Sequence, residues 1–141
     1  MDKQRGMTLV EMMTVMAVLG ILTAIAIPSY SSYMMKTRRA DAKVALTSSA
    51  QQFERCYTRY YSYVQTANGG QCPLVLPYNT PNGTYTIDAD PAATPTAGVT
   101  ANSFALKATP IGKQALDTQC GAFQLNQNNS QSVSTGASGC W

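Results

Sequence analysis

Histidine is absent from this chain of 141 residues, and charged residues make up only 12% of it. Without histidine the chain has no Ser/His/Asp set, and it contains no plausible metal cluster. A glycine-rich phosphate loop is also missing. We therefore expect no enzymatic activity, no cofactor and no metal. The formal charge of +3 is too small to indicate a polyanionic partner by itself.

Charge is also missing from a long N-terminal stretch, because Glu11 is the sole charged residue between Arg5 and Lys36. The apolar run from Met12 to Pro28 lies within this stretch. Together with the uncharged residues that flank it, the run is long enough to cross a bilayer as a helix, which needs about 20 residues. A carboxylate beside hydrocarbon is costly, so Glu11 is interpreted as functional. A secretory signal is cut after its apolar run, whereas here the small residue Gly6 precedes it.

A family resemblance rests on three segments. Residues 5–11 (Arg-Gly-Met-Thr-Leu-Val-Glu), Gly20 and residues 26–30 (Ala-Ile-Pro-Ser-Tyr) resemble the class III leader and first helix of type IV pilins. The resemblance implies that an inner-membrane prepilin peptidase cuts between Gly6 and Met7 and methylates the new N-terminus at Met7. The whole apolar helix then stays on the mature chain.

The same resemblance implies assembly roles for Thr8, Glu11, Gly20 and Pro28. In pilins the equivalent glutamate pairs with the N-terminus of a neighbouring subunit; the alternative is an interfacial acid that reaches lipid headgroups. Glycine and proline both weaken a helix. In pilins the segment between them melts when the subunit enters the fibre, whereas a simple proline kink is the alternative.

Four cysteines, an even number without a CxxC pair, favour two disulfides in an oxidising compartment over buried free thiols. Three pairings are possible, and we choose the local one, Cys56–Cys72 with Cys120–Cys140. The basic run 36–39 beyond the apolar segment would by the positive-inside rule keep the C-terminal side in the cytoplasm. The cysteines and the leader favour the opposite orientation.

We expect an α+β protein with the type IV pilin fold. One helix is predicted from about Thr8 to about Val64, apolar all round in its first half and amphipathic in its second. The apolar stripe is Leu46, Ala50, Phe53, Tyr57, Tyr60 or Tyr61, and Val64. Alternating residues predict four antiparallel strands near 85–89, 104–108, 123–125 and 131–134, with residues 73–81 as loop. The expected divisions are a leader (1–6), a membrane and assembly segment (7–35) and an extracytoplasmic domain (36–141) with a disulfide-bounded C-terminal region.

Two further patterns suggest ligands. Arg55, Arg59 and Tyr63 would form a basic and aromatic stripe at helical spacing, which suits DNA; a solvated face or a subunit contact is the alternative. Residues 88–91 (Asp-Ala-Asp-Pro) suggest a calcium loop only weakly, and we favour a turn that ends a strand.

The ending Cys140-Trp141 and residues 54–58 resemble minor pilins of the twitching-motility and competence systems. The expected function is therefore a minor structural subunit of a type IV pilus, acting in assembly, twitching motility, adhesion or DNA uptake. Alternatives are a DNA-binding uptake receptor, a major pilin or a type II secretion pseudopilin. Expected partners are other pilin subunits, prepilin peptidase, the inner-membrane assembly platform and the inner membrane before assembly. The uptake alternative adds DNA as a partner.

Overall fold

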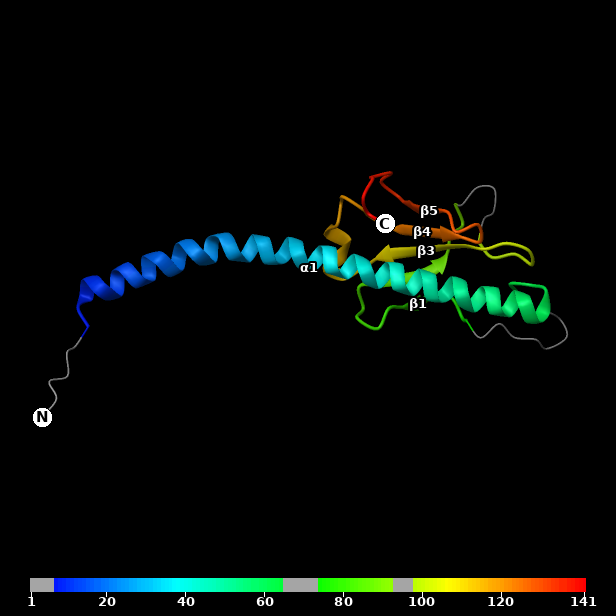
Figure 1. Cartoon of the computed structure of the whole chain (residues 1–141), viewed down its shortest axis with the longest axis horizontal. Coiled ribbons are helices and arrows are strands. Elements are labelled where there is room, and N and C mark those ends of the chain that lie inside the picture. Colours follow the sequence, from blue (N-terminus) through cyan, green and yellow to red (C-terminus); the bar gives the residue numbers. More distant parts are fainter. Residues whose placement is uncertain (1–6, 65–73, 93–97) are drawn as a thin grey trace, which may run out of the picture. The chain divides into compact units, whose positions relative to one another are not determined.

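The computed structural model describes residues 7–64, 74–92 and 98–141. It divides into two compact units, residues 1–36 and 37–141, and the boundary between them falls inside one helix. In the described part, the first unit consists of the beginning of this helix. The second unit contains the rest of the helix and an antiparallel sheet (Figure 1).

The helix α1 extends from Leu9 to Tyr60, and it is continuous through Gly20 and Pro28. Pro28 has no N–H, so one backbone hydrogen bond is missing at this point of the helix. The predicted end at Val64 is wrong. Tyr61 has a φ of 54°, in the left-handed region, and this conformation stops the helix four residues earlier than expected.

The sheet has the strand order β1-β2-β3-β4-β5, and every neighbouring pair is antiparallel. The strands are β1 (Tyr78–Asn79), β2 (Tyr85–Ala89), β3 (Ala105–Pro110), β4 (Phe123–Asn126) and β5 (Gln131–Val133). The four predicted strands correspond to β2–β5. The prediction of four was one short, because β1 comprises only two residues inside a segment rich in proline, which gives no alternating pattern.

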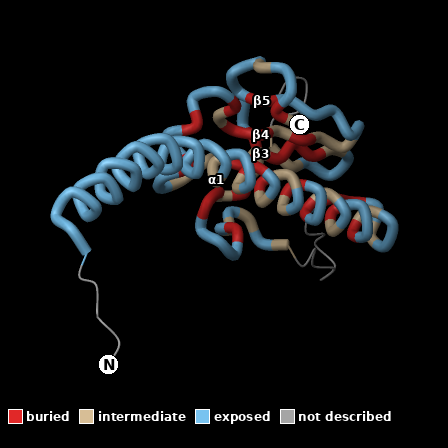
Figure 2. Tube along the Cα trace, turned by 60° about the vertical axis from the view of Figure 1, so that its left-hand side comes forward, coloured by how far each residue is buried: buried red, intermediate tan, exposed pale blue. Residues whose placement is uncertain are grey.

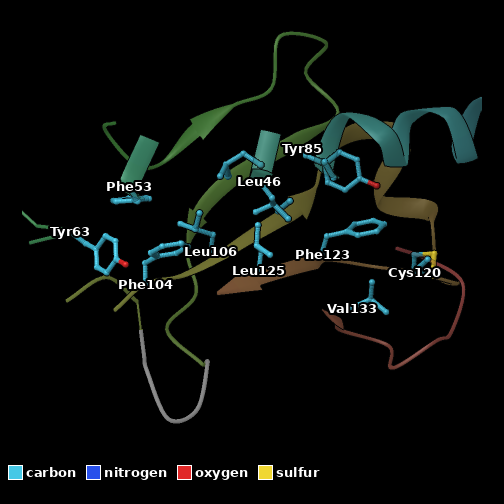
Figure 3. Packing of buried hydrophobic residues seen from close by; sticks show 14 residues of the cluster. Leu46, Phe53, Tyr63, Tyr85, Phe104, Leu106, Cys120, Phe123, Leu125 and Val133 are labelled. Atoms are coloured by element: carbon cyan, nitrogen blue, oxygen red, sulfur yellow. A yellow bond between two sulfur atoms is a disulfide. The ribbon is translucent and has the colours of Figure 1, made fainter. Parts of the chain in front are cut away.

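Helix α1 covers one face of this sheet (Figure 2). Its buried side chains recur every three or four residues and include Leu46, Phe53 and Cys56. They meet the inward face of the strands, where Tyr85, Phe123 and their neighbours form the aromatic part of the core (Figure 3). The members of the cluster are Ala42, Leu46, Phe53, Tyr63, Tyr85, Ile87, Phe104, Leu106, Ala108, Cys120, Phe123, Leu125, Val133 and Cys140.

The predicted stripe on the helix is therefore correct in its middle and wrong at its end. Ala50 and Tyr57 are half-buried against the cluster, whereas Tyr61 and Val64 are exposed. Both of these residues follow the last helical residue, so the helical spacing no longer applies to them.

The C-terminal region is fixed to the sheet in two ways. Cys120 and Cys140 form a disulfide, which confirms the pairing expected there. The Trp141 ring packs edge-on against Phe123, with ring centroids 5.6 Å apart, and its indole Nε1 donates a hydrogen bond of 2.7 Å to the Ser132 carbonyl. These contacts hold the last residues of the chain against fraying.

Asp90 follows β2 and is almost fully buried. Its carboxylate accepts hydrogen bonds from the Ala92 backbone N–H (3.1 Å) and from the Gln124 side-chain amide (2.7 Å). Asp88, in contrast, is exposed. Asp90 therefore ends the strand by accepting hydrogen bonds from a backbone and a side-chain donor. Because Asp90 is buried and Asp88 is exposed, the two carboxylates do not form a calcium loop.

One buried ion pair joins the helix to the segment after β3. The Arg39 Nε and Nη2 atoms donate hydrogen bonds of 2.7 and 2.8 Å to the two Asp117 carboxylate oxygens. Burial alone would raise the pKa of Asp117, but the hydrogen bonds from Arg39 and from the Cys120 backbone N–H outweigh it and lower the pKa below its ordinary value. The pair attaches the short 3-10 helix η1 (Gly112–Leu116) to α1.

Replacing Asp117 with asparagine leaves the Arg39 guanidinium buried without its counter-charge. We expect Asp117→Asn to lower the free energy of unfolding by about 3–5 kcal/mol at neutral pH. Because the folded-state pKa of Asp117 is lowered, its contribution to stability is present above about pH 4 and is lost as the pH falls through the folded-state pKa.

Urea unfolding of the full chain in detergent, followed by circular dichroism at neutral and acid pH, measures both effects. The control is Asp88→Asn, since Asp88 is exposed, and it should change stability by no more than about 0.5 kcal/mol. An equal loss in the two variants would contradict the assignment.

Candidate functional site

The N-terminal end of α1 carries a reciprocal cap built from two residues. The Glu11 backbone N–H donates to the Thr8 hydroxyl oxygen at 3.2 Å, and the Thr8 backbone N–H donates to the Glu11 carboxylate at 3.3 Å. The Thr8 hydroxyl also lies 3.4 Å from the same carboxylate oxygen. This is a capping box, which satisfies N–H groups that have no partner inside the helix.

The sequence interpretation missed this cap, although the spacing of threonine and glutamate three residues apart just before an apolar run was a readable signal. The predicted partner of Glu11, the α-amino group at Met7 of a neighbouring subunit, would exist only after the predicted cleavage. Gly6 lies outside the described residues, and Met7 is 73% exposed. In the chain described here the Glu11 carboxylate accepts a hydrogen bond from the Thr8 backbone N–H, and its side chain is exposed.

Beyond the cap, the first part of α1 is apolar on every side, and none of its large side chains is buried. Figure 2 shows this segment as exposed along its length. By length and composition α1 contains a stretch able to cross a membrane. A helix that is apolar all round and exposed in the single chain is suited to burial in lipid or among other helices.

At the other end of α1, the predicted stripe of Arg55, Arg59 and Tyr63 is only partly present. Arg55 and Arg59 are both exposed and lie four residues apart, hence on one face of the helix. Tyr63 is not on this face. The helix ends at Tyr60, and the chain turns so that Tyr63 is 6% exposed and belongs to the core.

Tyr63 is held by aromatic neighbours and one carboxylate. Its ring stacks on Tyr57 at 4.6 Å and meets Phe104 edge-on at 5.0 Å between centroids. Its hydroxyl donates to the Glu54 carboxylate at 3.0 Å. Burial, followed by this hydrogen bond, raises the pKa of Tyr63 to about 12. Tyr63 is therefore a structural residue that packs the segment after the helix against the core.

Two other tyrosines take the place that the sequence interpretation gave to Tyr63. The Arg59 guanidinium carbon lies 5.5 Å from the centroid of the Tyr60 ring, which is a cation–π distance. Tyr61 is 80% exposed, and its ring meets Tyr57 edge-on. We call Arg55, Arg59, Tyr60 and Tyr61 the basic–aromatic end of α1. The left-handed turn at Tyr61 produces it, and helical periodicity does not predict such a turn.

A shallow hollow of about 400 Å³ lies beside Arg55. Phe104 and Leu125 contribute its apolar part, and Glu54 and Gln127 contribute polar groups. Cys56, one helical turn before Tyr60, is buried and disulfide-bonded. Its predicted partner Cys72 lies outside the described residues, so this pairing stays a prediction.

Comparison with known proteins agrees with this architecture. A type IV pilin from Shewanella oneidensis of known structure has 29% sequence identity and a TM-score of 0.50, covering 76% of this chain and 97% of that one. A model of the prokaryotic N-terminal methylation motif matches residues 1–27. A long helix with this motif, packed on an antiparallel sheet with a C-terminal disulfide, defines a type IV pilin.

A second family model, described as type IV minor pilin ComP, DNA uptake sequence receptor, matches residues 28–124. Because this match covers more than half of the chain, the protein belongs to the type IV minor pilin ComP family. The match over residues 1–27 confirms the resemblance drawn from residues 5–30, and the match over residues 28–124 agrees with the resemblance to minor pilins drawn from residues 54–58.

Curated relatives match mainly over part of their length. Prepilin peptidase-dependent protein D of Escherichia coli (strain K12) is 35% identical over 80 residues, which are 57% of this chain and 54% of that protein. A fimbrial protein of Pseudomonas aeruginosa is 46% identical over 52 residues, which are 36% of this chain and 34% of that protein. The chain thus spans about half of the first relative and about a third of the second.

The different burial of the two tyrosines predicts different effects of truncation. Tyr63→Ala should lower the free energy of unfolding by about 3–5 kcal/mol, as expected for a large buried aromatic side chain. Tyr61→Ala removes an exposed ring and should change it by no more than about 0.5 kcal/mol. Thermal unfolding of the full chain in detergent checks both variants, and a Tyr61→Ala variant as unstable as Tyr63→Ala would refute this placement.

Proposed function

We propose that this chain is a minor subunit of a type IV pilus and that it takes part in DNA uptake. The observation that carries the proposal is the family match over residues 28–124, which includes the amphipathic part of α1 and strands β2 and β3. That family is described as a DNA uptake sequence receptor. The basic–aromatic end of α1 supplies a surface of the right chemistry.

For assembly, prepilin peptidase would cut between Gly6 and Met7 and methylate Met7, creating a positive α-amino group four residues before Glu11. The subunit would wait as a single-pass protein of the inner membrane, and the assembly platform would then extract it into an extracellular pilus. The Glu11 carboxylate contacts Thr8 at 3.3 and 3.4 Å, which are long for charge-assisted hydrogen bonds. Exchange of this contact for the charged N-terminus of a neighbouring subunit would neutralise both groups in an apolar fibre.

For DNA, the two exposed arginines would contact phosphates and the exposed tyrosine ring would stack on a base. Arg55 and Arg59 lie on one helical face, and Tyr61 exposes most of its ring directly beyond them. Cations with aromatic rings bind the backbone and the bases of nucleic acid at once. The rival role for the same surface is contact with another pilin subunit, which involves no phosphate.

The assembly role predicts a specific defect in Glu11→Ala. Processing should be intact, since the cleavage site is unchanged, while recovery of the subunit in sheared filaments should be lost because the charged N-terminus of a neighbour has no carboxylate to meet. The measurement is the intact, non-reduced mass of the protein from membranes and from filaments. Residues 7–141 plus one methyl and minus four hydrogens would also report cleavage, methylation and two disulfides.

The matched control for this experiment is Thr14→Val, because Thr14 is exposed on the same helix and its hydroxyl donates only to the Glu11 backbone carbonyl. It should assemble as the unchanged protein does. Normal recovery of Glu11→Ala in filaments would contradict the assembly role.

The DNA role predicts a change in the dependence of binding on salt. If Arg55 and Arg59 each contact one phosphate, the double variant Arg55→Gln/Arg59→Gln should reduce the slope of log K against log salt by about 1.8 for duplex DNA. Tyr61→Ala should weaken binding to a single strand by about 1–3 kcal/mol with little change in this slope. Binding of labelled DNA to the full chain in detergent over a series of salt concentrations provides both values.

A charge-matched control, Lys43→Gln/Lys107→Gln, removes two cations elsewhere in the same unit. It should leave the slope nearly unchanged. Equal effects of the two double variants would mean that net charge alone retains DNA. An unchanged slope in the arginine variant would assign the surface to a subunit contact.

A further inference from the structure

By the positive-inside rule, the basic run at residues 36–39 would favour the orientation opposite to the one we expect. In the folded chain this run lies beside the segment that contains η1, because Arg39 pairs with Asp117. We infer that Arg38, Lys113 and Leu116 form a surface that docks the second unit on anionic phospholipid headgroups while the subunit is anchored in the membrane. We call these three residues the docking surface. This inference rests on the proposed function only in requiring that α1 anchors the chain in a membrane before assembly.

Charge is concentrated in the two segments that make up this surface. Residues 36–43 and 112–117 together contain five cations and two carboxylates. One carboxylate, Asp117, is neutralised by the buried Arg39. The other, Asp41, accepts hydrogen bonds from the Asn82 side chain at 3.0 Å and from the Thr84 hydroxyl at 3.1 Å. Within the described ranges no ion pair involves Arg38 or Lys113, so their charge is available to an external anion.

The ion pair brings the two segments together. Arg39 donates hydrogen bonds to both carboxylate oxygens of Asp117, and its Nη2 also donates to the Gln119 side-chain oxygen at 2.9 Å. Arg38 precedes Arg39 in the helix, and Leu116 precedes Asp117. The turn η1, gold in Figure 1, accordingly lies against this part of α1. A buried contact thus holds the η1 segment, where Lys113 and Leu116 are exposed, beside the part of α1 that carries the half-buried Arg38.

Leu116 adds an exposed apolar side chain to the charged residues of the docking surface. It is 73% exposed, and Lys113 and Ala115 beside it are also exposed, while Gln114 of the same turn is buried. An exposed leucine next to lysine is the combination that binds the boundary between headgroups and acyl chains, where apolar burial and attraction to anionic lipid act together. An acidic protein partner would account for the lysine and the arginine, and it would give no reason for the exposed leucine.

The distance along the chain agrees with this partner. A helix of about 20 residues crosses the hydrocarbon core, so a span that begins near Val10 ends near Tyr30. Tyr30 and Tyr33 are exposed on the helix, as expected of aromatic residues at a membrane boundary. Arg38 follows Tyr30 closely in the sequence, and its long side chain can extend back toward the headgroup layer.

The experiment uses the full chain in lipid nanodiscs, one set of purely zwitterionic phosphatidylcholine and one set with added phosphatidylglycerol. Hydrogen exchange at residues 112–118, measured by mass spectrometry, reports docking of η1. We expect exchange to slow several-fold in the anionic discs, and the effect to weaken as salt is raised. The variants Lys113→Gln and Arg38→Gln should each reduce the protection by about five-fold at most.

The control Lys107→Gln removes one cation from the opposite, outward face of the sheet and should retain the protection. The variant Leu116→Ser should reduce protection in anionic discs while keeping its dependence on salt. Equal exchange in the two lipid compositions would overturn the inference. Protection that depends on the number of protein copies per disc, whatever the lipid, would also overturn it and assign the surface to another subunit.

Incorporation into the discs separates this test from that of the proposed function. A chain that fails to enter nanodiscs has no membrane anchor, and the proposed function fails with it. A chain that enters them without a response to phosphatidylglycerol keeps its anchor and refutes only the docking surface.

Discussion

The packing of one face of α1 on the inward face of the sheet is the contact on which the second unit depends. The sheet is antiparallel and has one polar outer face, so its apolar face needs a cover. Leu46 and Phe53 provide that cover from the helix, and Tyr85, Leu106 and Phe123 meet them from the strands. The beginning of the same helix has no such partner in the described chain. One continuous helix thus serves two environments, and its side-chain pattern changes where the environment changes.

Much of this arrangement was predictable because its causes are local. Strands β2–β5 alternate apolar and polar residues, and the stripe on α1 recurs at helical spacing, so both were predicted from the sequence with nearly the observed residues. The features that escaped prediction depend on contacts between distant residues. Strand β1 forms only because Tyr78 and Asn79 pair with Ile87 and Thr86.

The same reasoning applies to the candidate site. Arg55 and Arg59 could be placed on one face from their spacing, but the helix end could not, because a left-handed Tyr61 is no part of any periodic pattern. Tyr63 was consequently placed on the wrong surface. Arg39 could be recognised only as one member of a basic run. Its buried pairing with a carboxylate 78 residues later is a property of the folded chain alone.

The terminal segment after β5 affects whether a strand of another molecule can add to the sheet. Strand β5 is at the edge of the sheet, where free backbone groups invite the addition of a strand from another molecule. The Val133 carbonyl, which faces this edge, accepts a hydrogen bond from the Gly136 backbone N–H, and the Trp141 ring packs on Phe123 of the neighbouring strand. The disulfide keeps this terminal segment in place beside the strand. The terminal segment therefore occupies a backbone acceptor of this edge strand, which hinders the addition of a strand from another molecule at that point.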